Sequence, residues 1–139
     1  MKIASTFISI VICCFLSGCG GPVYEKKLNG NYYLDAVDED EDMAIGIQVD
    51  EQGVGVIGAT VFAVGQNDNF IVAKQHPRNP PGVIDKSTTN YFIIPLQLKV
   101  SKSTDRNYFG PLQLEQFEKK KRELGIGDLE FTIVFNELE

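Results

Sequence analysis

The feature that most constrains this chain is an apolar run near its N-terminus that ends at Leu16-Ser17-Gly18-Cys19. Lys2 is the only charged residue before Glu25, and most of residues 3–16 are apolar. A positive start followed by such a segment is typical of a secretory signal peptide, and the run is shorter than the roughly 20 residues of a membrane-spanning helix. The glycines and the proline that follow it end any helix. The part of the chain that folds therefore begins after this run.

The four residues at the end of the run resemble the lipobox of bacterial lipoproteins, which reads Leu, small, small, Cys. The resemblance implies that residues 1–18 are a cleaved signal peptide and that Cys19 carries a diacylglyceryl group. Because one acyl chain gives only marginal membrane binding, stable attachment requires two or three chains. The alternative is a plain secretory signal or a short anchor in which the cysteine occurs by chance.

The residue after Cys19 bears on the location of the protein. Gly20 stands where an Asp would be the familiar signal for retention in the inner membrane of Gram-negative bacteria. By analogy, we expect the outer membrane, facing the periplasm, in a Gram-negative cell. In a Gram-positive cell the lipid would lie in the outer leaflet of the plasma membrane.

The composition of the mature chain, residues 19–139, excludes several classes of protein. Cleavage removes one of the 13 Lys and Arg and none of the 19 Asp and Glu, which leaves a net charge of −7. Such a charge does not favour nucleic acid as a partner. Cys13 and Cys14 leave with the signal peptide, and Cys19 carries lipid. The folded part therefore has no disulfide, no cysteine-based metal site and no cysteine nucleophile.

The pattern along the mature chain predicts one domain. Residues 19–31 are expected to be the lipidated cysteine and a flexible tether, and residues 32–139 the globular domain. Alternating or continuous apolar residues predict about six strands, and an amphipathic segment that opens at Gly110-Pro111 and stops at Gly125 predicts one helix. The helix should bury Leu114, Phe117 and Leu124. The expected strands cover residues 31–37, 43–49, 54–64, 70–75, 90–94 and 129–135, and after an interruption at Pro95 the strand at 90–94 resumes over residues 96–100.

Short turns between successive strands favour antiparallel pairing, and residues 43–64 are expected to form a hairpin. We therefore predict an α+β fold in which one curved antiparallel sheet of about six strands packs against one helix. An all-β, barrel-like closure with the helix as a plug is the alternative.

Three segments resemble a family of small bacterial lipoproteins catalogued as domain of unknown function 3997. They are residues 65–77 (GQNDNFIVAKQHP), residues 90–94 (NYFII), and the stretch from Gly110-Pro111-Leu112 to residues 123–126 (ELGI). The turn that leads into a strand ending in Lys-Gln-His-Pro is the most specific of these. The resemblance covers most of the mature chain and supports an uncharacterised lipoprotein, but it implies no activity.

One polar and basic cluster stands out in this acidic chain. It comprises Lys74, Gln75, His76 and Arg78, and it runs into a stiff loop with three prolines in residues 77–81. Stiff loops present contact residues at a low entropic cost. We predict that this cluster, together with the turn containing Asn67 and Asp68, is the surface that contacts an envelope protein or a small ligand. A purely structural corner is the alternative.

His76 is also the only histidine of the chain, so it is the residue a hydrolase would use with a nearby carboxylate. No serine or threonine lies in a nucleophile motif, and we expect His76 to be a surface residue. The acidic run at residues 38–42 lacks the spacing of a calcium loop and is expected to be solvated. The basic run at residues 119–122 complements the helix dipole, with contact to an acidic partner or anionic lipid as the alternative.

These observations predict a lipid-anchored protein of the bacterial cell envelope with a non-enzymatic binding or interaction role, without a metal or another cofactor. Two alternatives stay open. One is a small hydrolase-like enzyme that uses His76, and the other is a passive structural lipoprotein of the envelope.

Overall fold

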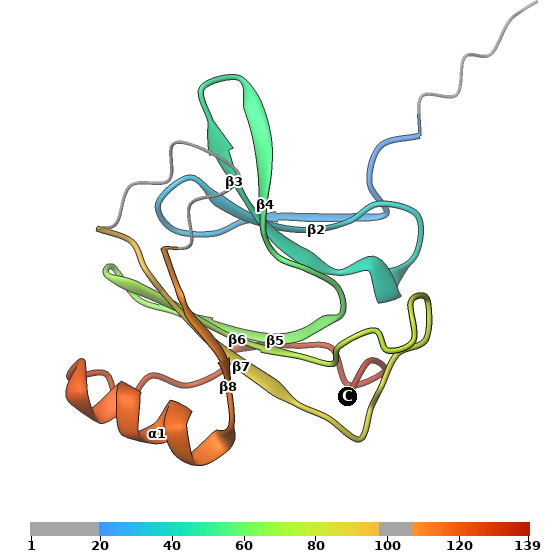
Figure 1. The fold of residues 1–139 in the computed structure, drawn as a ribbon. Coiled ribbons are helices and arrows are strands. Elements are labelled where there is room, and N and C mark those ends of the chain that lie inside the picture. The colour runs from blue at the N-terminus through green and yellow to red at the C-terminus, as the bar shows by residue number, and fades with distance from the viewer. Residues whose placement is uncertain (1–19, 98–106) are drawn as a thin grey trace, which may run out of the picture.

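The computed structural model describes residues 20–97 and 107–139, which form two antiparallel sheets and one helix (Figure 1). The first sheet has its strands in chain order, β1-β2-β3-β4, and the second has the order β8-β7-β6-β5-β9. The strands of the first sheet are β1 Tyr24–Lys27, β2 Tyr32–Ala36, β3 Ala44–Val49 and β4 Gln52–Ile57. Those of the second are β5 Val61–Gln66, β6 Phe70–Gln75, β7 Asn90–Pro95, β8 Phe109–Leu112 and β9 Ile133–Val134.

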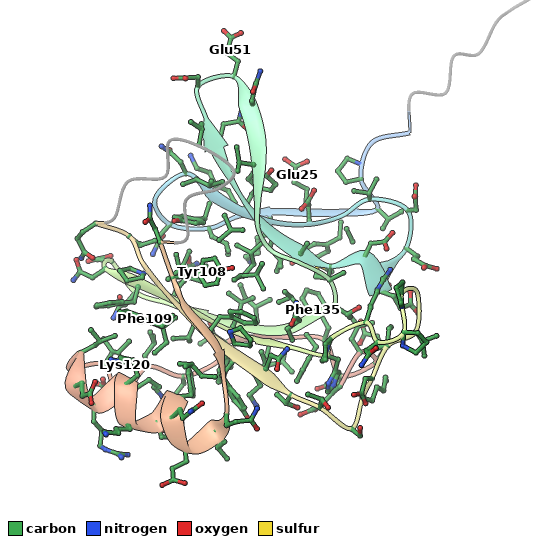
Figure 2. All side chains as sticks on the ribbon, in the orientation of Figure 1. Glu25, Glu51, Tyr108, Phe109, Lys120 and Phe135 are labelled. Carbon is green, nitrogen blue, oxygen red and sulfur yellow. The ribbon has the colours of Figure 1, made fainter. Side chains whose placement is uncertain are left out.

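The domain has three layers because both faces of the second sheet are covered. In β6, Ile71 and Ala73 face the core between the two sheets, whereas Val72 faces helix α1, Leu114–Glu123. β7 alternates in the same way. This explains why both strands are apolar in nearly every position: a strand buried on both faces loses the alternation of a half-exposed one. Tyr108 and Phe135 also pack against the core between the sheets (Figure 2).

Helix α1 lies against the outer face of the second sheet, near β7 and β8 (Figure 1). Gln113 caps its N-terminus, and its side chain and that of Gln116 each accept a hydrogen bond from the other residue's backbone N–H. Phe117 is fully buried among Val72, Ile93 and Ile126. The expected burial of Leu114 is wrong, since this side chain is 55% exposed, and Lys121 is buried instead. Leu114 is the first residue of the helix, so its side chain extends beyond the packed face.

The prediction of antiparallel pairing and one helix is confirmed, but the single sheet of about six strands is wrong. The expected strand at residues 54–64 is interrupted at residues 58–60, where the chain leaves β4 in the first sheet and enters β5 in the second. Thr60 then pairs with His76 through two backbone hydrogen bonds. Apolar periodicity cannot locate such a crossing, because the residues on both sides of it face the same core. The helix covers the second sheet from outside, so it is not a plug.

The boundaries of several predicted elements also change. The hairpin at residues 43–64 is confined to β3 and β4, and Asp50 takes a left-handed conformation (φ 54°) in its turn. Gly110 and Pro111 belong to β8, so the helix begins later than predicted. In the expected strand at residues 129–135, only Ile133–Val134 is β-strand. Residues 98–100, the end of another expected strand, lie outside the described residues.

The predicted flexible tether is wrong over most of its described length. Within it, β1 pairs with β2 from Tyr24 opposite Ala36 to Lys27 opposite Tyr33, and Leu28 is buried. The sequence pattern does not reveal this strand, because its charged side chains lie on an exposed edge and give no apolar signal. Backbone hydrogen bonds hold it in the sheet. The lipidation residue Cys19 itself lies outside the described residues, and only residues 20–23 separate it from β1.

In residues 20–97 and 107–139, no helix combines the length and the apolar character needed to cross a membrane.

Candidate functional site

Most side chains of the predicted contact cluster at residues 74–78 make contacts within the protein itself. The Gln75 side chain is buried, and its Nε2 donates a hydrogen bond to the carbonyl oxygen of Gly58 at 2.7 Å. Its Oε1 accepts a hydrogen bond from Nδ2 of Asn90 at 3.1 Å. Gln75 therefore joins the crossing between the sheets to the start of β7.

The expectation that His76 is a surface residue is wrong, since it is 3% exposed. Its ring stacks on Phe62 with 4.2 Å between the ring centroids, and its Nδ1 donates a hydrogen bond to the carbonyl oxygen of Thr88 at 2.8 Å. Its Nε2 is buried and has no hydrogen-bond partner in the described part of the chain. The backbone pairing of His76 with Thr60 continues the β5–β6 ladder and fixes the position of the residue just before the proline-containing loop.

In the part of the chain that the structure describes, the groups bonded to His76 and to Asp85 do not form the arrangement of a serine hydrolase. The carboxylate of Asp85, which interacts electrostatically with His76, accepts hydrogen bonds from the hydroxyl groups of Ser87 and Thr88. These hydroxyl groups, in that order, lower the pKa of Asp85 most, and His76 makes only the smallest contribution. In a serine hydrolase, the histidine accepts the proton of the nucleophile and donates its other proton to the carboxylate. Here the hydroxyl groups bind the carboxylate, and the imidazole binds a backbone carbonyl.

Arg78 connects the proline-containing loop to the acidic run at residues 38–42. Its Nη2 donates hydrogen bonds to the carbonyl oxygen of Glu41 at 2.6 Å and to Oδ1 of Asp42 at 3.0 Å. Burial raises the pKa of Asp42, but the Asp38 amide and then the Arg78 side chain outweigh it, so the pKa lies below its usual range. The expectation of a wholly solvated run is therefore wrong at its C-terminal end. Glu41 and Asp42 are half-buried, and the short 3-10 helix η1, Asp40–Asp42, is held in place.

Lys74 lies on the outer face of β6, among aromatic rings. Its ammonium group is 4.8 Å from the centroid of Phe131 and 6.0 Å from those of Phe62 and Tyr91. Such cation–π contacts stabilise a partly desolvated charge. Lys74 thus covers an aromatic cluster and offers little free charge to a partner.

Asn67 and Asp68 lie at the opposite end of β6 from His76 and Arg78, so the predicted site is not brought together. Five residues of extended strand correspond to about 16 Å. Oδ1 of Asn67 accepts hydrogen bonds from the backbone N–H groups of Asn69 and Phe70 at 2.9 and 2.8 Å, which forms the turn. Asp68 is exposed.

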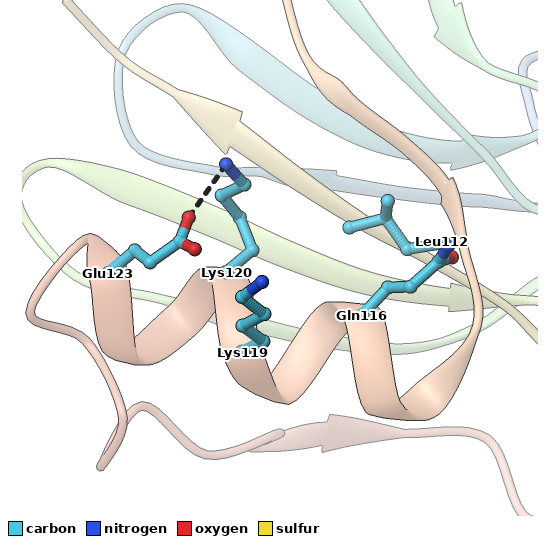
Figure 3. A pocket seen from close by; sticks show the side chains of 5 residues that line it. All are labelled: Leu112, Gln116, Lys119, Lys120 and Glu123. Atoms are coloured by element: carbon cyan, nitrogen blue, oxygen red, sulfur yellow. Dashed lines mark ion pairs between the residues drawn. The ribbon is translucent and has the colours of Figure 1, made fainter.

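A hollow of about 210 Å³ lies between α1 and the end of β8 (Figure 3). Lys120 pairs with Glu123 at 2.9 Å and lies over the Phe109 ring, 4.9 Å from its centroid. Lys119 is exposed, and no ion pair of its side chain is found among the described residues. The residues that line the hollow are Leu112, Gln116, Lys119, Lys120 and Glu123.

The side chains of the basic run at residues 119–122 lie on different faces of the helix, because each residue is rotated by about 100° from the previous one. Lys121 turns inward, packs over Phe117 and lies 3.9 Å from the Glu118 carboxylate. Arg122 is exposed. The sequence indicates the positive charge but not the hollow, because the hollow depends on the position of β8 beside the helix. In residues 20–97 and 107–139, no three His, Cys, Asp or Glu side chains converge as metal ligands would.

Comparison with known families assigns the chain to one of them. The model of a family described as a protein of unknown function (DUF3997) matches residues 29–138, so the chain belongs to this family. The resemblance seen in the sequence is thereby confirmed, and all three segments that carry it lie within the match. No curated protein and no solved structure matches the chain.

Proposed function

We propose that this protein is a lipid-anchored protein of the bacterial cell envelope whose domain has a non-enzymatic binding role. The observation that carries the proposal is Leu16-Ser17-Gly18-Cys19, which ends an apolar run and is separated from the first strand by the four residues 20–23. A signal peptide followed directly by a lipid-accepting cysteine supports export of the domain from the cytoplasm. The membrane that holds it depends on the type of cell. In a Gram-negative cell, the residue after Cys19 favours the outer membrane, and in a Gram-positive cell the anchor lies in the plasma membrane.

The binding surface that the geometry favours is the hollow on α1 with the exposed cations beside it. Lys119 and Arg122 are exposed and have no ion pair within residues 20–97 and 107–139, whereas Gln75, His76 and Arg78 bond within the domain. In the mature chain, residues 19–139, with its net charge of −7, a local basic surface attracts acidic groups that the rest of the protein repels. The helix lies on the opposite side of the domain from the blue segment with which the described chain begins (Figure 1). The partner we propose is an acidic segment of an envelope protein.

The anchor is tested by replacing the proposed lipidation residue with serine. We expect Cys19→Ser to abolish metabolic labelling with palmitate and to release the protein from membranes or stall its processing. Cys14→Ser, in the same segment, is the control and should leave labelling unchanged. Persistent labelling of Cys19→Ser would refute lipidation at this position.

The binding surface is tested by reversing its free charges. We expect Lys119→Glu with Arg122→Glu to reduce the capture of envelope proteins from detergent-solubilised membranes by tenfold or more, with the far-UV circular dichroism unchanged. The matched control is Lys26→Glu with Lys27→Glu, which changes the charge equally on the exposed edge strand β1. Equal capture by both variants and the unaltered protein would exclude the helix as the binding surface.

The hydrolase alternative has no specific contact in its favour, because the imidazole of His76 is bonded to the Thr88 carbonyl and is buried. A passive structural role differs from the proposed one in predicting no saturable partner in the capture experiment.

A further inference from the structure

The distance between the proposed lipid anchor and the folded domain limits how the domain can sit on a membrane. Tyr24, the first residue of β1, is five residues after Cys19. Five residues in a fully extended chain reach at most about 18 Å. The end of the first sheet at which β1 begins must therefore lie beside the bilayer that holds Cys19.

Two strongly exposed apolar side chains lie at this end of the sheet. Tyr24 is paired with Ala36 in the antiparallel register, so Val23 and Val37 flank this pair at the end of the two strands. Val37 is 60% exposed and Val23 is 55% exposed. Scattered exposed valines need no explanation, but these two are neighbours, and one of them is only four residues from the anchor.

The neighbouring segments belong to the same end of the domain. Residues 38–42 directly follow Val37, and Arg78 bonds them to the loop that contains Val83, which is 52% exposed. In Figure 1, η1 and this loop lie on the side where the described chain begins, and α1 lies on the far side. Asp38, Glu39 and Asp40 are exposed carboxylates, so this end suits an uncharged lipid surface better than an anionic one.

We propose that the Val23 and Val37 end of the domain docks onto the bilayer surface, with both valines in the headgroup region and α1 directed away from the membrane. This inference rests on the proposed lipidation of Cys19. The lipid supplies the attachment, and the short link brings the valines to the interface at a high effective concentration. The docked orientation leaves the hollow on α1 open to a partner.

The test uses the lipidated full chain in phosphatidylcholine vesicles. Because Cys19 is the only cysteine of the mature chain and its sulfur carries lipid, a single introduced thiol can be labelled specifically. A fluorophore is placed at Val37→Cys and, as the matched control, at Arg122→Cys on the exposed face of α1. We expect a spin label on the lipid headgroup to quench the Val37→Cys fluorophore at least threefold more strongly than the Arg122→Cys fluorophore.

Docking is separated from mere proximity by lengthening the link. With ten Gly and Ser residues inserted after Gly21, we expect the preferential quenching at position 37 to persist and Val23→Asp to abolish it. Equal quenching at positions 37 and 122 on vesicles that carry the protein would overturn the proposed docking while leaving the anchor intact. Failure of the protein to float with the vesicles would overturn the anchor itself, and the docking with it.

The alternative to docking onto lipid is that the two valines contact a second copy of the chain. The soluble Cys19→Ser protein distinguishes this case in sedimentation at concentrations up to 100 times those on the vesicles. We expect a monomer. A dimer that Val37→Asp dissociates would assign the valines to a protein interface and would overturn docking onto lipid.

Discussion

At the scale of single residues, the domain uses its polar side chains mainly to join segments that are distant in the sequence. Gln75 joins the crossing between the sheets to β7, and Arg78 joins the proline-containing loop to η1. These residues formed the predicted contact surface because a cluster of polar residues in an acidic chain suggests a partner outside the domain. The sequence does not reveal that the partners are backbone carbonyls and side chains of the same domain.

The first prediction concerns Arg78. Replacing it by methionine keeps the aliphatic part of the side chain but leaves the Glu41 carbonyl and the Asp42 carboxylate without their donor. We expect Arg78→Met to lower the free energy of unfolding at pH 7 by about 2 kcal/mol, the usual cost of losing hydrogen bonds to a charged group. Urea denaturation measures this loss in the free energy of unfolding, with Lys26→Met on the exposed edge strand as the control.

The same pair predicts how stability depends on pH. Since the pKa of Asp42 in the folded protein lies below its unfolded value, its contribution is fully present above the unfolded pKa of about 3.9 and is lost as the pH falls through the folded pKa. Arg78→Met should therefore lose less stability than the unaltered protein on acidification across this range. Parallel acid profiles of the two proteins would show that the pair does not contribute.

At the scale of elements, the packing of β5 requires a glycine where the segment before β9 passes close to its backbone. A Cβ atom at Gly65 would overlap the backbone carbonyl of Glu130, and this segment leads into β9. The expected strand at residues 54–64 stops just before Gly65, yet this glycine lies within the buried strand β5. The structure thus gives a steric reason for a glycine that composition alone attributes to flexibility.

Glycine substitutions test this close approach. We expect Gly65→Ala to lower the free energy of unfolding by about 1–3 kcal/mol, because the added methyl group forces β5 and the segment before β9 apart. Gly55→Ala in β4 is the matched control, since its Cβ would meet nothing within 4 Å. It should be neutral or slightly stabilising in the same urea denaturation. Equal effects of the two variants would contradict the close packing at Gly65.

At the scale of the whole molecule, α1 is attached to the second sheet through one small cluster. Phe117 lies at its centre, with ring centroids 4.8 Å from Tyr91 and 6.0 Å from Phe131. The larger core lies on the other side of the second sheet. The stability of the helix, and with it the proposed binding surface, therefore depends on one aromatic side chain.

We expect Phe117→Ala to lower the free energy of unfolding by about 3–5 kcal/mol, because it removes a fully buried ring and leaves a cavity. Leu114→Ala, on the same helix but 55% exposed, should change it by less than about 0.5 kcal/mol. Thermal unfolding followed by circular dichroism measures both. A similar small loss in the two variants would show that the helix is not held by this cluster.

The sequence by itself determined the features that depend on local chemistry. The signal segment and Cys19 follow from hydrophobicity and residue type, and they lead to the proposal of a lipid anchor. The antiparallel pairing and the presence of one helix follow from short turns and periodicity, and the structure confirms both. The absence of a second cysteine after Cys19 excludes disulfides without reference to the fold.

Tertiary structure alone decided which residues meet across the molecule. It divided the strands between two sheets. The sequence could not show this division, because the apolar pattern stays the same where the chain crosses from one sheet to the other. It buried His76 and separated it from Asn67 and Asp68 along β6. It also placed β1 in the part expected to be a tether, since backbone pairing does not depend on side-chain polarity. That strand ties the first sheet closely to Cys19, and the proposed orientation of the domain on the membrane follows from it.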